Sequence, residues 1–151
     1  LDRHRAGTKL FELKHRPPNG YAGKFSTPYC IAVGFLDGKA GLEQFTDERT
    51  QDPRVRELAA KVSYVVNPDD PYPRNFTGHI RATLTDGTIR EVRRGHMRGG
   101  QHEPLTDDDI RRKYLDNARF GGWSAERAEA VAQALDRIVA GGGVDLAAAR
   151  G

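Results

Sequence analysis

A helix-start signal followed by a dense apolar run, at residues 26–36, constrains this chain more than any other feature. The run begins with Ser-Thr-Pro at 26–28, where a hydroxyl can accept a hydrogen bond from a first-turn amide and proline sets the first helical φ. The residues that follow are apolar on nearly every side, which is typical of a helix enclosed by other elements. Asp37-Gly38 then ends the pattern. We therefore expect a buried helix from Thr27 or Pro28 to Leu36.

The N-terminus of this helix is the first candidate binding site. Free first-turn amides and the positive end of the helix dipole attract anions. Lys24, Ser26 and Tyr29 lie beside that terminus in the sequence. We predict that it takes a small carboxylate. Ser26 would act as the helix cap before any substrate contact, and Lys24 would either bind the carboxylate or face solvent.

Hydrophobic periodicity and turn signals predict an α+β fold, a small antiparallel or mixed sheet packed with helices. Strands are expected at 8–13 and 63–66, and a hairpin at 77–85 and 88–94 closed by Asp86-Gly87. A brief helical turn is expected at 41–45. Asp52-Pro53 begins a second helix, which we expect to reach about Lys61.

Two further helices are indicated by their caps. Thr106 and the three Asp residues after it start one helix, because carboxylates in the first turn interact favourably with the dipole. Ser124 starts the other, which ends at the glycine run 141–143. The inner side of this last helix is expected to carry Ala128, Val131, Ala132, Leu135 and Ile138.

Composition agrees with one compact domain. The chain has 151 residues, of which 37% are hydrophobic and 30% charged, enough for one real core. No apolar stretch has the length of a membrane span, so we expect a cytoplasmic protein with no membrane partner. The single Cys30 excludes an internal disulfide and a cysteine-ligated cluster. The histidines show no metal-ligand spacing, and we expect neither a metal nor another cofactor.

The formal net charge of +3 raises the question of nucleic-acid binding. The basic runs are interleaved with acidic residues, as on an ordinary solvated face, and no recognition helix or RNA-binding signature accompanies them. We therefore expect no nucleic-acid partner. The alternative requires steep salt dependence and five arginines on one face. These are Arg90, Arg93, Arg94, Arg111 and Arg112.

Several motifs resemble the C-terminal domain of the MmgE/PrpD family. The first is the spacing of Lys24, Ser26 and Tyr29 before a small-residue helix that ends in Leu-Asp-Gly. The others follow downstream in the order found in the family: the helix at 53–62, Thr-Leu-Thr-Asp-Gly at 83–87, Gly95-His96, the segment 104–110, Lys113 and Asn117. The resemblance covers about residues 9–117, and the order of the motifs is its most specific feature.

The resemblance implies a part of an enzyme. Members of this family dehydrate, decarboxylate or epimerise small polycarboxylic acids such as 2-methylcitrate, cis-aconitate or iminodisuccinate. Their catalytic cleft lies between a large helical domain and a smaller α/β domain, and only the smaller one is similar to this chain. We expect residues 1–120 to form it and residues 121–151 to return to the missing helical domain. The chain alone would then be inactive, and a homo-oligomer such as a dimer is expected.

The resemblance also implies roles for individual residues. Tyr29 matches a family position whose phenol faces the substrate and is the predicted catalytic residue. The alternative for it is a core aromatic with its hydroxyl bonded to backbone. Predicted substrate-binding residues are Lys24, Ser26, His96, Arg94 and Arg98. His96 can otherwise be an ordinary exposed loop residue. The alternative function is a standalone carboxylate- or protein-binding module without catalysis.

Overall fold

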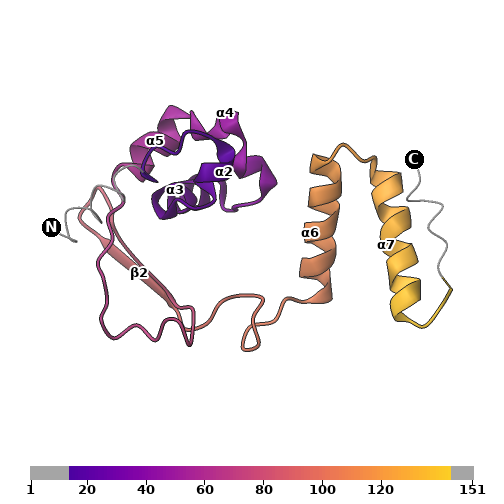
Figure 1. Ribbon diagram of the computed structural model, residues 1–151. Coiled ribbons are helices and arrows are strands. Elements are labelled where there is room, and N and C mark those ends of the chain that lie inside the picture. Colours follow the sequence, from indigo (N-terminus) through magenta and orange to yellow (C-terminus); the bar gives the residue numbers. More distant parts are fainter. Residues whose placement is uncertain (1–13, 144–151) are drawn as a thin grey trace, which may run out of the picture. The chain divides into compact units, whose positions relative to one another are not determined.

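The computed structural model describes residues 14–143 and divides the chain into two compact units, Leu1–Val65 and Val66–Gly151 (Figure 1). The described elements are short helices and a two-stranded antiparallel sheet, which confirms the α+β class. The predicted boundary between 1–120 and 121–151 concerns packing on a domain outside this chain, and it stays a prediction.

Unit 1 consists of short helices around one longer helix, α3 (Thr27–Asp37). Ser26 caps α3 through its side chain, and Gly38 ends it with φ 68°, so the predicted start and stop are confirmed. The remaining elements are α2 (Gly20–Gly23), η1 (Leu42–Phe45), α4 (Asp47–Thr50) and α5 (Pro53–Ala59). The predicted turn at 41–45 and helix after Asp52 are thereby confirmed, although α5 ends two residues before Lys61.

The core of unit 1 forms where α3 packs against α5. Tyr29, Ala32 and Val33 of α3 meet Val55 and Ala59 of α5, and all are at most 1% exposed. Within unit 1, the prediction that other elements enclose α3 is confirmed for one face only. Its opposite face is open, with Phe35 58% exposed, because the short helices of unit 1 pack on one side only.

One of the two predicted single strands is absent from the structure, and the other falls outside the residues that the structure describes. Residues 63–66 form no strand, and Val65 is 92% exposed, which corrects that prediction. Ser63 to Val66 has β-branched residues, but β-propensity yields a strand only where a neighbouring strand supplies pairing and packing. The strand expected at 8–13 lies outside the described residues.

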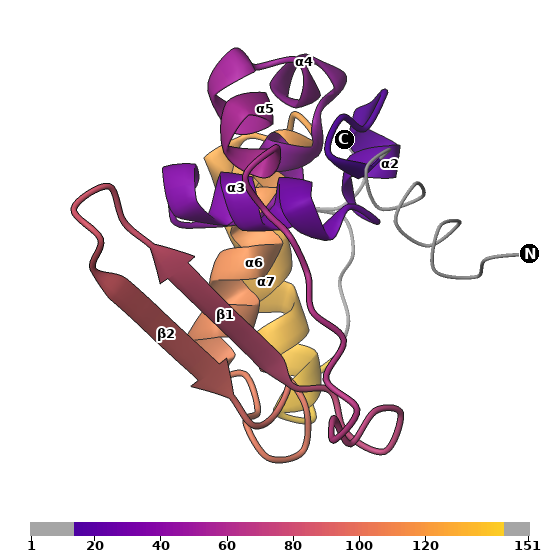
Figure 2. The same cartoon turned by 90° about the vertical axis from the view of Figure 1, so that its left-hand side faces the viewer.

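Unit 2 begins with the predicted hairpin, now seen as β1 (Gly78–Thr83) and β2 (Ile89–Arg94), drawn side by side in Figure 2. The strands are antiparallel, with Gly78 opposite Arg94 and Thr83 opposite Ile89. Leu84 continues the ladder to Thr88, and Gly87 adopts φ 82° in the turn. A three-residue turn with glycine in the left-handed region therefore closes the hairpin.

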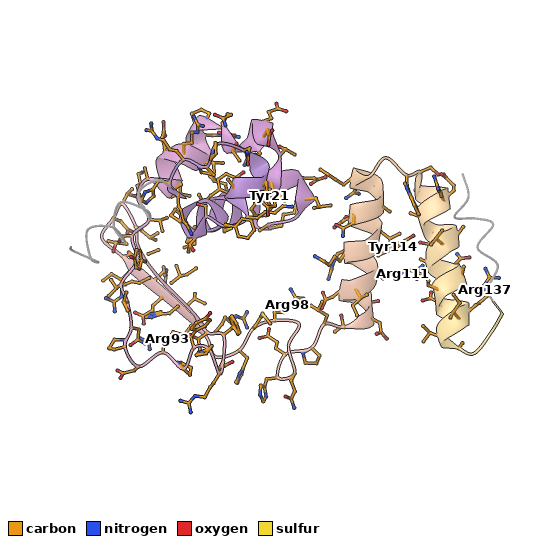
Figure 3. The ribbon with its side chains drawn as sticks, in the orientation of Figure 1. Tyr21, Arg93, Arg98, Arg111, Tyr114 and Arg137 are labelled. Carbon is orange, nitrogen blue, oxygen red and sulfur yellow. The ribbon has the colours of Figure 1, made fainter. Side chains whose placement is uncertain are left out.

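Two antiparallel helices follow, α6 (Asp107–Phe120) and α7 (Ala125–Val139). Both predicted caps are confirmed, since Thr106 and Asp109 form a capping box and Ser124 accepts from the Arg127 amide. Figure 3 shows Tyr114 and Arg111 of α6 directed at α7. There Tyr114 donates to the Ala128 carbonyl oxygen (3.1 Å), and Arg111 pairs with two carboxylates of α7.

The inner side of α7 was predicted correctly in part. Ala128, Val131 and Ala132 are buried as expected. Leu135 is 45% exposed, and Ala134 is buried instead, so the prediction for Leu135 was wrong. Helical spacing predicts which residues share one side of a helix. Which of them are buried depends on where the neighbouring helix packs against that side.

Two glycines of unit 1 make a matched stability test. A Cβ at Gly20 would lie 1.8 Å from the Phe45 carbonyl oxygen, whereas a Cβ at Gly34, inside α3, meets nothing within 4 Å. We expect Gly20→Ala to destabilise the fold by about 1–3 kcal/mol, because backbone must shift. Gly34→Ala is expected to stabilise it by about 1 kcal/mol through helix propensity. Urea unfolding measures both, and equal effects of the two changes would contradict this packing.

Candidate functional site

The N-terminus of α3 is closed by its own cap. The Ser26 hydroxyl donates to the Lys14 carbonyl oxygen (2.5 Å) and accepts from the Tyr29 amide (3.1 Å). The Cys30 amide donates to the Ser26 carbonyl oxygen, and Pro28 has no amide hydrogen. Few first-turn amides are thus left for an anion. The structure confirms Ser26 as a cap, and its contact with substrate stays a prediction.

Tyr29 lies in the core of unit 1. It is 1% exposed, its ring centroid lies 5.8 Å from that of Phe45, and its hydroxyl donates to the Gln44 carbonyl oxygen at 2.5 Å. Burial raises the pKa of the phenol, so it stays protonated at neutral pH. This is the geometry of a core aromatic bonded to backbone. A catalytic role for Tyr29 stays a prediction, and it requires the hydroxyl to leave Gln44.

A polar network extends from Gln44 across unit 1. The side-chain amide of Gln44 donates to the Asp37 carboxylate (3.1 Å), and that carboxylate also accepts from Arg49 (2.6 Å). Arg49 also pairs with Asp52. Hydrogen bonds from the side chain and amide of Arg54 lower the pKa of Asp52 to about 2, with Arg49 adding to the effect. Sequence reasoning missed this network, because its members share no motif and meet only through the turns that connect α3 to α5.

Lys24 lies on the exposed side of the α3 entrance. Two exposed aromatic rings flank it in the chain, Tyr21 and Phe25, in edge-to-face contact with centroids 5.2 Å apart (Figure 3 labels Tyr21). Their exposure also went unpredicted, although an aromatic on each side of a lysine was visible in the sequence. An amphipathic patch of this kind suits an anion that carries an apolar portion.

The other predicted residues lie in unit 2, where Arg94 ends β2 and His96 and Arg98 follow on the segment between β2 and α6. His96 is exposed and stacks on His102, with ring centroids 4.4 Å apart. Gly99 adopts φ 88° and donates to the Glu103 carbonyl oxygen at 2.7 Å, which closes the loop. Asn75 fixes its start by donating to the Gly95 carbonyl oxygen at 2.6 Å. The loop therefore has a defined shape.

The two predicted arginines, Arg94 at the end of β2 and Arg98 on the loop, both face carboxylates. Arg98 pairs with Asp109 at 2.8 Å, and this contact is the main reason why the pKa of Asp109 falls to about 2. Arg94 lies 3.6 Å from Glu103. The arginine side chains are 63% and 70% exposed, and exposed ion pairs of this kind are weak. Each guanidinium can therefore exchange its carboxylate for one of a ligand.

The arginines named for nucleic-acid binding do not share a face. Strand alternation puts Arg93 on the opposite side of the hairpin from Arg90 and Arg94. On α6, Arg111 and Arg112 are bonded to carboxylates of unit 2. Nucleic-acid binding required all five arginines on one face, and the register of the hairpin does not place them so.

Residues 14–143 contain no group of three or more His, Cys, Asp or Glu side chains placed to hold a metal ion. In that same range, no helix is both long enough and apolar enough to cross a membrane. The predicted site residues fall into two sets, Lys24, Ser26 and Tyr29 in unit 1 and the other three in unit 2.

The described residues thus define a small α+β domain whose candidate site residues are cations, a capping hydroxyl, a buried phenol and a loop histidine. The chain belongs to the MmgE/PrpD family, because the MmgE/PrpD C-terminal domain matches its residues 1–137.

A curated relative agrees with this membership. The chain is similar to cis-aconitate decarboxylase of Mus musculus, with 33% identity over 104 residues. The matched part is 68% of this chain and 21% of the relative, so the chain spans about a fifth of the length of the protein that it matches. The family assignment reaches further along the chain than the motifs at 9–117 indicated.

The polar network predicts an acid-sensitive stability. The pKa of Asp52 is about 2 in the folded chain and roughly 3.9 in an unfolded one. Its contribution is therefore fully present above about pH 4 and is lost as the pH falls toward 2. Asp52→Asn, which preserves the helix cap, should flatten the decline of unfolding free energy in this window. Asp69→Asn, on an exposed loop, is the control, and an unchanged decline in the Asp52 variant would contradict the contacts of Asp52 with Arg54 and Arg49.

Proposed function

We propose that this chain forms the smaller, α+β part of a lyase or isomerase that acts on small polycarboxylic acids by dehydration, decarboxylation or epimerisation. The observation that carries the proposal is the match of the MmgE/PrpD C-terminal domain to residues 1–137. The similarity to a decarboxylase of cis-aconitate, a tricarboxylic acid, supports this substrate class.

The proposal assigns the principal acid and base to a helical domain outside this chain. The chain covers 21% of its relative, which leaves most of such an enzyme to be supplied elsewhere. Among the described candidates, the phenol is buried and the loop cations are paired with carboxylates. The chain alone is therefore inactive in this proposal, and it completes a cleft in a larger, homo-oligomeric enzyme.

The cations of this chain would bind substrate carboxylates. Each of the three reactions places negative charge beside a carboxylate, and positioned cations stabilise that charge in the transition state. Arg98 and Arg94 are suited to this because a guanidinium binds a carboxylate through two parallel hydrogen bonds. Lys24 would act as a simple cation. His96, on the same loop as Arg98 and two residues after Arg94, would donate to or accept from the substrate.

Tyr29 would act as a proton donor in this scheme. Its raised pKa keeps the proton on the phenol, which is the form that can donate to a developing negative charge. Its bond to Gln44 must then be exchanged for one to the substrate. Ser26 would position Tyr29 by capping the turn that carries it, and a direct substrate contact would need its bond to Lys14 to open.

The experiment that tests the proposal joins this chain to the coding region that precedes it and assays the product against 2-methylcitrate, cis-aconitate and iminodisuccinate. Turnover that needs both parts supports the assignment. If no helical domain is encoded there, or none of the three acids is consumed, the enzyme proposal fails and a carboxylate- or protein-binding module replaces it.

Arg98→Gln tests the substrate contact in the active assembly. Loss of a hydrogen bond to a charged group is expected to raise KM by about 10- to 100-fold. Arg119→Gln is the matched control, because Arg119 is similarly exposed, at 68%, and pairs with one helix carboxylate, Asp116. Steady-state kinetics separate the two variants. Equal KM values for both would remove Arg98 from the site.

Tyr29→Phe separates the catalytic and the core roles. In either role the variant loses the bond to Gln44, and we expect about 1 kcal/mol less stability in urea unfolding. A catalytic phenol adds a fall in kcat of about 100-fold, measured on protein verified as folded. A kcat that stays at the parental value would assign Tyr29 to the core alone.

A further inference from the structure

The β1–β2 hairpin has two chemically different faces. On one face, Glu91 accepts hydrogen bonds from His79, Arg81 and Arg93, three cationic or titratable neighbours on the same side. The Arg93 and Arg81 contacts measure 2.8 and 3.1 Å. These bonds pair the charged groups of that face, which carries one exposed apolar residue, Ile89, at its end. They lower the pKa of Glu91 to about 2, with Arg93 contributing most.

The other face is apolar and open. Ile80 lies directly opposite Val92, and Leu84 continues the same alternation beyond the end of β1. Their exposed fractions are 40%, 61% and 43%. A two-stranded hairpin with no layer packed on it is only marginally stable in water. An amphipathic hairpin of this kind indicates that something covers the apolar side.

The charges on this face indicate the chemistry of the partner that would pack on it. Arg90 is opposite Ala82 and Arg94 is opposite Gly78, so both lie on the apolar side and bracket Val92. Strand positions on this side of residues 78–94 carry no carboxylate. Within residues 14–143 Arg90 forms no ion pair, and Arg94 is held only by a 3.6 Å contact with Glu103.

A second copy of the chain fits this face poorly. Packing two such faces together would set arginine against arginine, and like charges at an interface are unfavourable. A strand added at the hairpin edge would pair backbone groups and leave the apolar side open. A helix laid across the strands covers the face, and carboxylates along its borders would meet both arginines.

We propose that the apolar hairpin face, formed by Ile80, Leu84 and Val92 between Arg90 and Arg94, docks an amphipathic helix whose apolar stripe is bordered by carboxylates and which comes from outside these 151 residues. The docking surface shares Arg94 with the proposed substrate contacts, so its test relies on Arg90 and Val92, which have no part in the proposed reaction.

The test uses the full chain and two synthetic helical peptides with the same leucine stripe, one bordered by glutamates and one by lysines. Fluorescence anisotropy should show the glutamate peptide binding at least about tenfold more tightly. Arg90→Glu should reverse that preference, and Val92→Thr, which keeps strand propensity, should weaken binding of both peptides. Arg81→Gln, on the opposite face, is the matched control and should leave binding unchanged.

Three results would overturn the proposal. The first is equal binding of the two peptides, and the second is a preference that Arg90→Glu does not change. The third is a dimer of the parental chain in sedimentation that Val92→Thr dissociates, because a second copy would then occupy the face. Circular dichroism of each variant verifies that the helices remain folded.

Discussion

The hydrogen bond from the Tyr29 hydroxyl to the Gln44 carbonyl oxygen is the contact on which the arrangement of unit 1 depends. The ring of Tyr29 belongs to the core between α3 and α5, and a phenol buried there needs an acceptor for its proton. The turn η1 supplies that acceptor. Gln44 is thereby held under α3, where its side chain accepts from the Gly41 amide and donates to Asp37. The buried hydroxyl thus ties the turn that follows α3 to the core of unit 1.

Ion pairs join the same helices of unit 1. Asp37 and Asp52 lie at the ends of different helices, and Arg49 pairs with both while being about one-fifth exposed. A cation between two carboxylates avoids leaving either anion uncompensated as the short helices close over the core. The opposite end of α3 is a capped and packed turn, because the Ser26 hydroxyl donates to the Lys14 carbonyl oxygen and accepts from the Tyr29 amide.

Unit 2 is stabilised by different means. Caps at Thr106 and Ser124, the turn at Gly87 and ion pairs along α6 satisfy its backbone and charges, while α6 contributes no fully buried residue. The same balance agrees with membership in a family in which the matched relative is about five times as long as the matched segment.

The sequence by itself determined the features whose causes are local. The cap at Ser26, the stop at Gly38 and the start at Thr106 follow from hydrogen bonds within a few residues, so their positions were predictable. Tertiary structure alone decided the acceptor of the Tyr29 hydroxyl, the exposure of Leu135 and the absence of a strand at 63–66. The physical reason is that a side chain is buried, and a strand is paired, only by residues distant in the sequence, and one local pattern is compatible with several such surroundings.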